Sequence, residues 1–265
     1  MTVITHLLAG IIGGFFSIIP VGFDSYIYFW NSVNETIAGK NNSMFGFDVV
    51  SLIYLGAFLG LFFIYRNRFL AILKKASKLK YIKNGIQDDL TETFEVCATV
   101  IIWFVFSIIA CFLENAVLIS IFLCLTILIS YIVDFIKPMT LDRKKLFIFS
   151  GCMIALSAFV GFSEISVLFL LGIVKGKKAS NAINYTFLCS IPMYFIKFIV
   201  YFVKALIFGF SLNFWFVLPI IALAFISSFF AVSVTKKAAL KKNFKYFSYY
   251  TLVFTIVFIH TFLKG

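Results

Sequence analysis

The stretch that decides the fold is residues 146–174, LFIFSGCMIALSAFVGFSEISVLFLLGIV, an apolar run with basic sequence at both ends. DRKK ends directly before it at 142–145, and KGKK follows at 175–178. Since Lys and Arg in short loops mark the cytoplasmic side of a membrane, both ends are predicted to be cytoplasmic. The run has 29 residues, too few for two full spans of about 20 residues each. It therefore predicts a re-entrant hairpin that turns near Gly161, because Gly weakens a helix interior.

The composition of the chain places this hairpin in lipid. Of the 265 residues, 62% are hydrophobic and 13% are charged, whereas soluble domains have roughly 45–50% apolar and about 25% charged residues. The net charge is +12, and the basic residues behind it cluster between the apolar runs. There they predict contact with anionic membrane lipids rather than with nucleic acid. His6 and His260 lack ligand-like neighbours, and the cysteines show no CxxC spacing. No metal site and no cofactor is therefore expected.

Six further runs are long enough, or nearly so, to span a bilayer. They are 45–64, 94–113, 115–133, 185–207, 212–234 and 247–263. The most basic connection, 66–83, carries seven Lys or Arg residues and is predicted to be cytoplasmic. The other loops then alternate consistently, which predicts that both termini lie outside.

The N-terminal segment 3–30 is predicted to form a second re-entrant hairpin, broken near Pro20 and Gly22. It has no Lys or Arg and precedes an outer loop, so it is expected to enter from the opposite face. Its tip reads VGFDS at 21–25, and the tip of the other hairpin reads VGFSE at 160–164. In inverted-repeat membrane proteins such broken helices meet near the midplane and form the binding site. The two tips are therefore expected to face one another.

These segments together predict one all-α polytopic membrane domain, 1–265, with two opposed re-entrant helical hairpins and about six transmembrane helices in an inverted-topology repeat. The first repeat, 1–114, contains the hairpin 3–30 and the spans 45–64 and 94–113. The span 115–133 links the two halves. The second repeat, 134–265, contains the hairpin 146–174 and the spans 185–207, 212–234 and 247–263.

Three ionisable residues inside apolar sequence are the strongest functional candidates. Asp24 and Glu164 lie at the two hairpin tips, and Lys197 lies about 18 Å along the span that begins near Tyr185. Charged residues at this depth cost roughly 2.5–3.5 kcal/mol and are by default hypotheses of function. Lys197 is predicted to pair with Asp24, Glu164 or both. The alternative is that it extends to a lipid headgroup, as is also predicted for Lys204.

Other polar side chains allow two interpretations. Hydroxyl groups near the two tips could bind a phosphate or an ion, or could hydrogen-bond back to their own helices; these are Ser17, Ser25, Ser163 and Ser166. Acids at segment ends are predicted to be solvated boundary charges; these are Asp48, Glu92, Glu95, Glu114, Asp134 and Asp142.

Residues 151–192, GCMIALSAFVGFSEISVLFLLGIVKGKKASNAINYTFLCSIP, resemble the second signature region of the bacterial undecaprenyl-pyrophosphate phosphatases. The shared residues are Gly151, Leu156, Gly161, Ser163, Gly172, Phe187, Leu188, Ser190, Ile191 and Pro192. Gly14, Pro20 and Val21 resemble the first signature, and Leu55-Gly56-Ala57 resembles a further patch. The resemblance implies a protein of the bacterial cytoplasmic (inner) membrane with two opposed re-entrant hairpins and six spanning helices, as the charge pattern predicts.

The residues that differ from the family pattern bear on the chemistry. Members hydrolyse a lipid pyrophosphate with two glutamates, a serine, a histidine and an arginine. At these positions the chain carries, in that order, Gly13 and Ser17, Phe23, Tyr26 and Glu164. An arginine binds phosphate through paired hydrogen bonds, whereas a glutamate repels it. Since no acid, base or nucleophile of the family set remains, no catalytic residue is assigned.

Three functions are compatible with this sequence. The first is a non-catalytic relative that binds or translocates a polyprenyl phosphate or similar lipid, with coupling to protons or Na⁺. The second is an active lipid pyrophosphate phosphatase with a rewired site, and the third is a structural or interaction role. The predicted substrate or ion site comprises Ser17, Asp24, Ser25, Tyr26, Ser163, Glu164, Ser166 and Lys197. The oligomeric state is not predicted.

Overall fold

The fold is all-helical. A computed structural model describes residues 3–38, 45–78, 88–110, 113, 115–136, 143–209, 212 and 214–263. Within these ranges the chain forms ten helices and no strand, which confirms the predicted fold class. The helices are α1 (Val3–Ile18), α2 (Phe23–Ala38), α3 (Phe47–Lys78), α4 (Asp88–Ala110), α5 (Ala116–Ile132), α6 (Arg143–Leu156), α7 (Glu164–Val174), α8 (Ala179–Phe208), α9 (Phe214–Leu240) and α10 (Lys245–Leu263).

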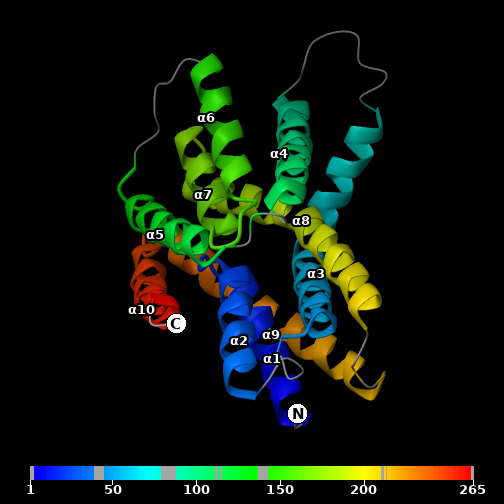
Figure 1. The fold of residues 1–265 in the computed structure, drawn as a ribbon. Coiled ribbons are helices and arrows are strands. Elements are labelled where there is room, and N and C mark those ends of the chain that lie inside the picture. The colour runs from blue at the N-terminus through cyan, green and yellow to red at the C-terminus, as the bar shows by residue number, and fades with distance from the viewer. Residues whose placement is uncertain are drawn as a thin grey trace.

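Two helical hairpins are present where the sequence predicts them. The first is α1 and α2 with its turn at residues 19–22, and the second is α6 and α7 with its turn at residues 157–163. Gly22 and Gly161 have φ angles of 72° and 98°, a backbone region that residues with a Cβ adopt only with strain. The hairpins extend from the middle of the molecule toward opposite ends (Figure 1). Their entry into a bilayer from opposite faces stays a prediction.

The two hairpin turns touch, as the sequence predicts. A Cβ added to Gly22 would lie 2.8 Å from the carbonyl oxygen of Gly161. Ser166 Oγ donates a hydrogen bond to the carbonyl oxygen of Pro20 at 3.4 Å. Thr126 of α5 holds the second turn, since its Oγ1 donates to Gly161 and accepts from the amide of Ser163. The turns are therefore positioned by each other and by α5.

The helix pairs follow a pattern of exchange between the two halves of the chain. α1 packs on α9 as α6 packs on α4, and α3 packs on α9 as α8 packs on α4. The pairs α3–α8 and α5–α10 join equivalent members of the two halves. These pairs are the ones that a pseudo-twofold relation between α1–α5 and α6–α10 would produce, but among the described residues α7–α8 and α1–α3 pack together without equally close counterparts in α2–α3 and α6–α8. Whether that relation is an inverted-topology repeat stays a prediction, as do the domain boundaries.

Four helices of the described chain are long and apolar enough to cross a bilayer, namely Phe47–Lys74, Thr93–Ala110, Ala179–Phe208 and Phe214–Leu240. The other two predicted spans form α5 and α10, with 17 and 19 residues. At a rise of 1.5 Å per residue these reach about 26 and 28 Å, slightly less than a hydrocarbon core of about 30 Å. Their role as spans stays a prediction.

Two predicted loops are helical instead. α3 continues through the basic segment to Lys78, and α2 continues to Ala38, past the expected end of the hairpin at residue 30. The predicted ends of these segments lie where the hydropathy falls. A helix does not end there unless a residue breaks it, and Lys, Arg and Leu are good helix formers. The rest of each predicted loop, 79–87 and 39–44, lies outside the described residues.

Close packing of α1 on α9 provides a matched test of this arrangement. A Cβ at Gly14 would lie 2.6 Å from Ala224 Cα in the backbone of α9, whereas the three atoms nearest to a Cβ at Gly13 all belong to the side chain of Ile53. Gly14→Ala is expected to lower the free energy of unfolding by about 1–3 kcal/mol. Gly13→Ala is expected to be near neutral, because the gain in helix propensity offsets the displacement of Ile53. Denaturant unfolding in detergent micelles, followed by circular dichroism, compares them. Equal midpoints would contradict the packing.

Candidate functional site

Lys197 of α8 joins the two hairpins. Its Nζ lies 2.6 Å from Asp24 Oδ2 and 2.6 Å from Glu164 Oε1. The side chains of Lys197, Asp24 and Glu164 are 14%, 17% and 7% exposed. The predicted pairing is thus confirmed, with both acids rather than with one of them. We call Asp24, Lys197 and Glu164 the triad.

Helix ends account for the position of both acids. Asp24 is in the first turn of α2, and Glu164 is the first residue of α7. The N-terminal turn of a helix carries partial positive charge, which stabilises a carboxylate. Ser163 caps α7 by accepting a hydrogen bond from the amide of Ser166 at 3.3 Å. Each hairpin turn therefore aims a helix N-terminus and one acid at Lys197, and the triad contains two formal negative charges for one positive charge.

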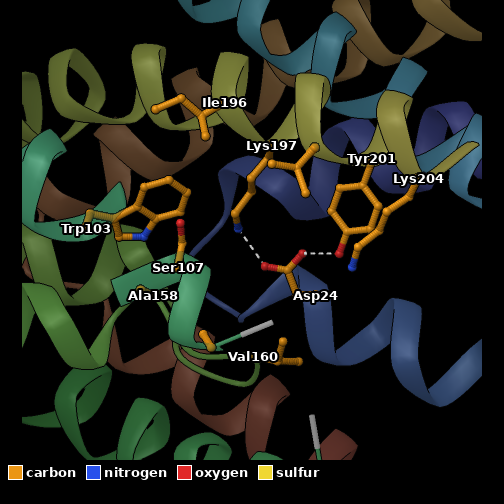
Figure 2. Close-up of a pocket in the computed structure, with 11 residues that line it drawn as sticks. Asp24, Trp103, Ser107, Ala158, Val160, Ile196, Lys197, Tyr201 and Lys204 are labelled. Atoms are coloured by element: carbon orange, nitrogen blue, oxygen red, sulfur yellow. Dashed lines mark hydrogen bonds and ion pairs between the residues drawn. The ribbon is translucent and has the colours of Figure 1, made fainter. Parts of the chain in front are cut away.

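Aromatic side chains from three helices surround the triad. Tyr54 OH donates to Asp24 Oδ1 at 2.5 Å, and Tyr201 OH approaches the same oxygen at 3.5 Å. Lys197 Nζ lies 5.1 Å from the ring centroid of Tyr54 and 5.8 Å from that of Trp103. Figure 2 shows Lys197 between Trp103 and Asp24, with Tyr201 on the other side of the carboxylate. These rings stabilise the ammonium through their π faces.

Two cavities adjoin the triad. The cavity between the hairpin turns measures about 10 Å³ and is lined by Ser17, Ser163 and all three triad residues, among others. It has room for about one water molecule. The second measures about 60 Å³, shares Asp24 and Lys197 with the first, and lies between α4 and α8. Lys204 projects from α8 into this region beside Tyr201 (Figure 2).

The predicted serines are mostly engaged within the protein. Ser17 Oγ donates to the carbonyl of Gly14 at 3.0 Å, and Ser25 Oγ donates to the carbonyl of Gly22 at 2.6 Å. Ser166 Oγ lies 2.7 Å from Ser130 Oγ. The interpretation that these hydroxyls bond locally therefore describes Ser17, Ser25 and Ser163, whose hydroxyl caps α7. The hydroxyl of Ser166 instead connects the second hairpin to Ser130 and Pro20.

Tyr26, also predicted for the site, lies apart from the triad. Its ring stacks on Phe254 of α10, with 3.7 Å between the ring centroids, and also packs on Phe16 and Tyr250. An α-helix rotates by about 100° per residue, so Tyr26, two residues after Asp24 on α2, points away from Lys197. The structure does not bring Tyr26 into the polar cluster.

Some of the acids predicted to be solvated are bound instead. Asp48 is 4% exposed and accepts hydrogen bonds from the amides of Val49 and Leu212. Asp134 accepts one from the amide of Lys245, and Glu95 forms ion pairs that are described below. The prediction was wrong for Asp48, because a segment end can still be covered by another loop. The side chains of Glu92, Glu114 and Asp142 lie outside the described residues.

The aromatic residues around the triad were not predicted from the sequence. Tyr54 and Trp103 come from α3 and α4, which carry no polar motif that would link them to the hairpins. A signal was present in α8, where Tyr194, Lys197, Tyr201 and Lys204 recur at intervals of three and four residues. Such spacing places side chains on one helix face. Lys204, predicted to reach a headgroup, lines the larger cavity on that face.

The comparisons with known proteins agree with the geometry. No curated protein matches the chain. A family model does match, described as bacitracin resistance protein BacA, over residues 6–257. The match includes both hairpins, the triad and the segment 151–192 that carries the resemblance. The apolar helices and this match across nearly the whole length show that the chain is an integral membrane protein that belongs to the BacA family of undecaprenyl-pyrophosphate phosphatases.

Proposed function

We propose that the chain is a non-catalytic member of this family that binds a polyprenyl phosphate or similar lipid in the bacterial cytoplasmic membrane and translocates it through the triad. The observation that carries the proposal is the position of Lys197, 2.6 Å from Asp24 and from Glu164. The resemblance puts a phosphate-binding arginine at position 164. A glutamate there binds the only cation of the triad and leaves about 10 Å³ of space between the turns.

The other replaced positions support the loss of hydrolysis. Phe23 packs on Tyr54, with 5.8 Å between ring centroids, and Ser17 donates its hydroxyl proton to a backbone carbonyl. A phosphatase needs a nucleophile with a base within hydrogen-bond reach, and a general acid for the leaving group. Asp24 and Glu164 are the only acids that line the small cavity, and both bind Lys197.

The cavity of about 60 Å³ between α4 and α8 supports lipid binding. Lys197 and Lys204 border it together with Ser107, and the apolar side chains of Ile196 and Val200 cover the adjoining wall. An amphiphile needs both kinds of surface, since its phosphate accepts hydrogen bonds from ammonium groups while its chain stays in apolar surroundings. At about 60 Å³ the cavity holds a few water molecules. Entry of a headgroup therefore requires Lys197 to leave at least one acid, which couples binding to opening of the hairpin contact.

The excess of carboxylates in the triad supports ion coupling as part of the same proposal. When a phosphate binds to Lys197, the carboxylates of Asp24 and Glu164 lose the positive charge that they share. Two carboxylates that close cannot both stay ionised without a cation, so a proton or Na⁺ would accompany the lipid. Intramembrane acids serve this role in transporters.

A reconstituted system tests the proposal. Proteoliposomes with fluorescent polyprenyl phosphate are assayed for transbilayer movement, with and without a proton or Na⁺ gradient, and in parallel for phosphate release from polyprenyl pyrophosphate. We expect movement without phosphate release. Asp24→Asn is expected to reduce movement roughly tenfold or more, because loss of one partner of a buried charge pair exceeds about 1.4 kcal/mol.

Asp134→Asn is the matched control, since Asp134 is also a hydrogen-bonded aspartate but lies at the end of α5. Movement should be unchanged in this variant. Phosphate release that Glu164→Ala abolishes would establish the phosphatase with a rewired site instead. No protein-dependent movement, and no effect of either triad substitution on lipid binding, would leave a structural or interaction role.

A further inference from the structure

A separate cavity of about 530 Å³ lies between α4 and α6. This volume is within the range of about 300–1,000 Å³ that is typical of ligand sites. Most of its wall is apolar and includes Phe94, Ala98, Ile102, Leu146, Phe147 and Ile154. Glu95 and Lys175 supply the charged part of the wall. None of its lining residues belongs to the triad, so it is a site in its own right.

Lys175 is a partly neutralised charge at the edge of this cavity. Its Nζ lies 3.8 Å from Glu95 Oε1, whereas Lys177 Nζ holds Glu95 Oε2 at 2.7 Å. The side chain of Lys175 is 14% exposed. Burial lowers the pKa of Lys175 from its usual value, and Glu95 only partly opposes this effect. Among the described side chains, two ammonium groups thus share one carboxylate, which leaves one formal positive charge beside an apolar cavity.

The surroundings of the cavity favour a negatively charged ligand. α4 and α6 begin at the end of the molecule where α3 and α7 finish (Figure 1). Lys74 near the end of α3 and Lys145 at the start of α6 add basic charge at this end. Basic segments next to membrane helices attract anionic lipid headgroups. A zwitterionic headgroup would bring its own ammonium group toward Lys175 and Lys177.

We propose that this cavity binds a phospholipid with an anionic headgroup. One acyl chain lies along the apolar wall between α4 and α6, and the phosphate accepts hydrogen bonds from Lys175. The headgroup supplies a second negative charge beside Lys175 and Lys177, which otherwise share the single carboxylate of Glu95. The site would hold a lipid of the surrounding membrane and does not depend on the function of the triad.

Two substitutions separate the apolar and the charged part of the site. A Cβ added to Gly151, which lines the cavity, meets no atom within 4 Å, so Gly151→Leu places an apolar side chain at a position that is open to the cavity. Lys175→Met removes the charge and keeps the length of the side chain. The controls are Ile148→Phe on the exposed side of α6 and Lys178→Met, an exposed lysine in the same loop. Neither control residue lines the cavity.

The full chain is extracted from vesicles that contain equal amounts of phosphatidylglycerol and phosphatidylethanolamine, and native mass spectrometry counts the retained lipids. We expect the wild type to retain phosphatidylglycerol preferentially. Lys175→Met should reduce this retention about fivefold, the effect of one lysine near an anionic surface. Gly151→Leu should reduce it further, and both controls should match the wild type. Thermal unfolding verifies that each variant is folded.

The proposal is overturned if phosphatidylglycerol retention is the same in the wild type and in both cavity variants, since the lipid would then be bound elsewhere. It is also overturned if Gly151→Leu displaces phosphatidylethanolamine and phosphatidylglycerol equally from a wild type that shows no preference. In that case the cavity holds lipid without regard to charge.

Discussion

Lys197→Met is expected to lower the free energy of unfolding by about 3–5 kcal/mol. The substitution leaves Asp24 and Glu164 without their shared cation, with carboxylate oxygens no more than about 5 Å apart. Burying an unpaired charge is far more costly than losing an exposed ion pair. Reversible unfolding in mixed detergent micelles, followed by circular dichroism, measures the change. Lys204→Met is the matched control on the same helix face and should lose only about 0.5–1 kcal/mol from its contacts with Phe47 and Tyr201.

A double-mutant cycle then separates the ion pairs from general damage. If Lys197→Met and Glu164→Gln act on one interaction, their combined effect is smaller than the sum of the two by about 0.5–3 kcal/mol. Strictly additive effects would show that the pair contributes nothing. The triple variant Asp24→Leu, Lys197→Met, Glu164→Leu should recover much of the stability, because apolar residues often replace buried ion pairs without loss. Loss of lipid movement in that stable variant would show that the triad serves function rather than folding.

Gly161→Ala is expected to destabilise the chain by about 2–6 kcal/mol. Gly161 has a φ of 98°, which costs an alanine about 1–3 kcal/mol. The new Cβ would also lie 2.7 Å from the backbone carbonyl of Ile119, and such overpacking costs about 1–3 kcal/mol more. The same unfolding measurement applies. Since Gly161 meets Gly22 in the contact between the turns, we also expect weaker binding of Lys197 by the acids.

Gly151→Ala is the control for this substitution. Gly151 lies within α6, and an added Cβ meets no atom within 4 Å. The variant should gain up to about 1 kcal/mol, because alanine is the better helix former. If Gly161→Ala were as stable as Gly151→Ala, the second hairpin turn would not be held as described.

Much of the architecture could be predicted from hydropathy and charge, because both depend directly on whether a segment lies in lipid or in water. A run of 29 residues between DRKK and KGKK is too short to cross the bilayer twice, and the structure shows a turn between α6 and α7 at Gly161. Helix ends were predicted less well, as α3 shows. Its basic segment has low hydropathy but stays helical, so a fall in hydropathy does not mark the end of this helix.

The composition of the site was only partly predictable. Asp24, Glu164 and Lys197 stood out because a charge in apolar sequence needs a partner, and few partners were available. Tyr54 and Trp103 did not stand out, because an aromatic residue in a membrane helix is unremarkable until its neighbours are known. Tyr26 was assigned from its place in a family pattern, and its side chain points to α10 instead.

The sequence by itself determined that this chain folds in lipid, that it breaks into helices at Gly22 and Gly161, and that three charges must find one another. These properties follow from local composition and backbone freedom. Only the tertiary structure decided that one lysine binds both acids, and that little space remains between the turns. Those facts depend on α2, α7 and α8 meeting at one point, and contacts between residues up to 177 positions apart leave no local pattern in a single sequence.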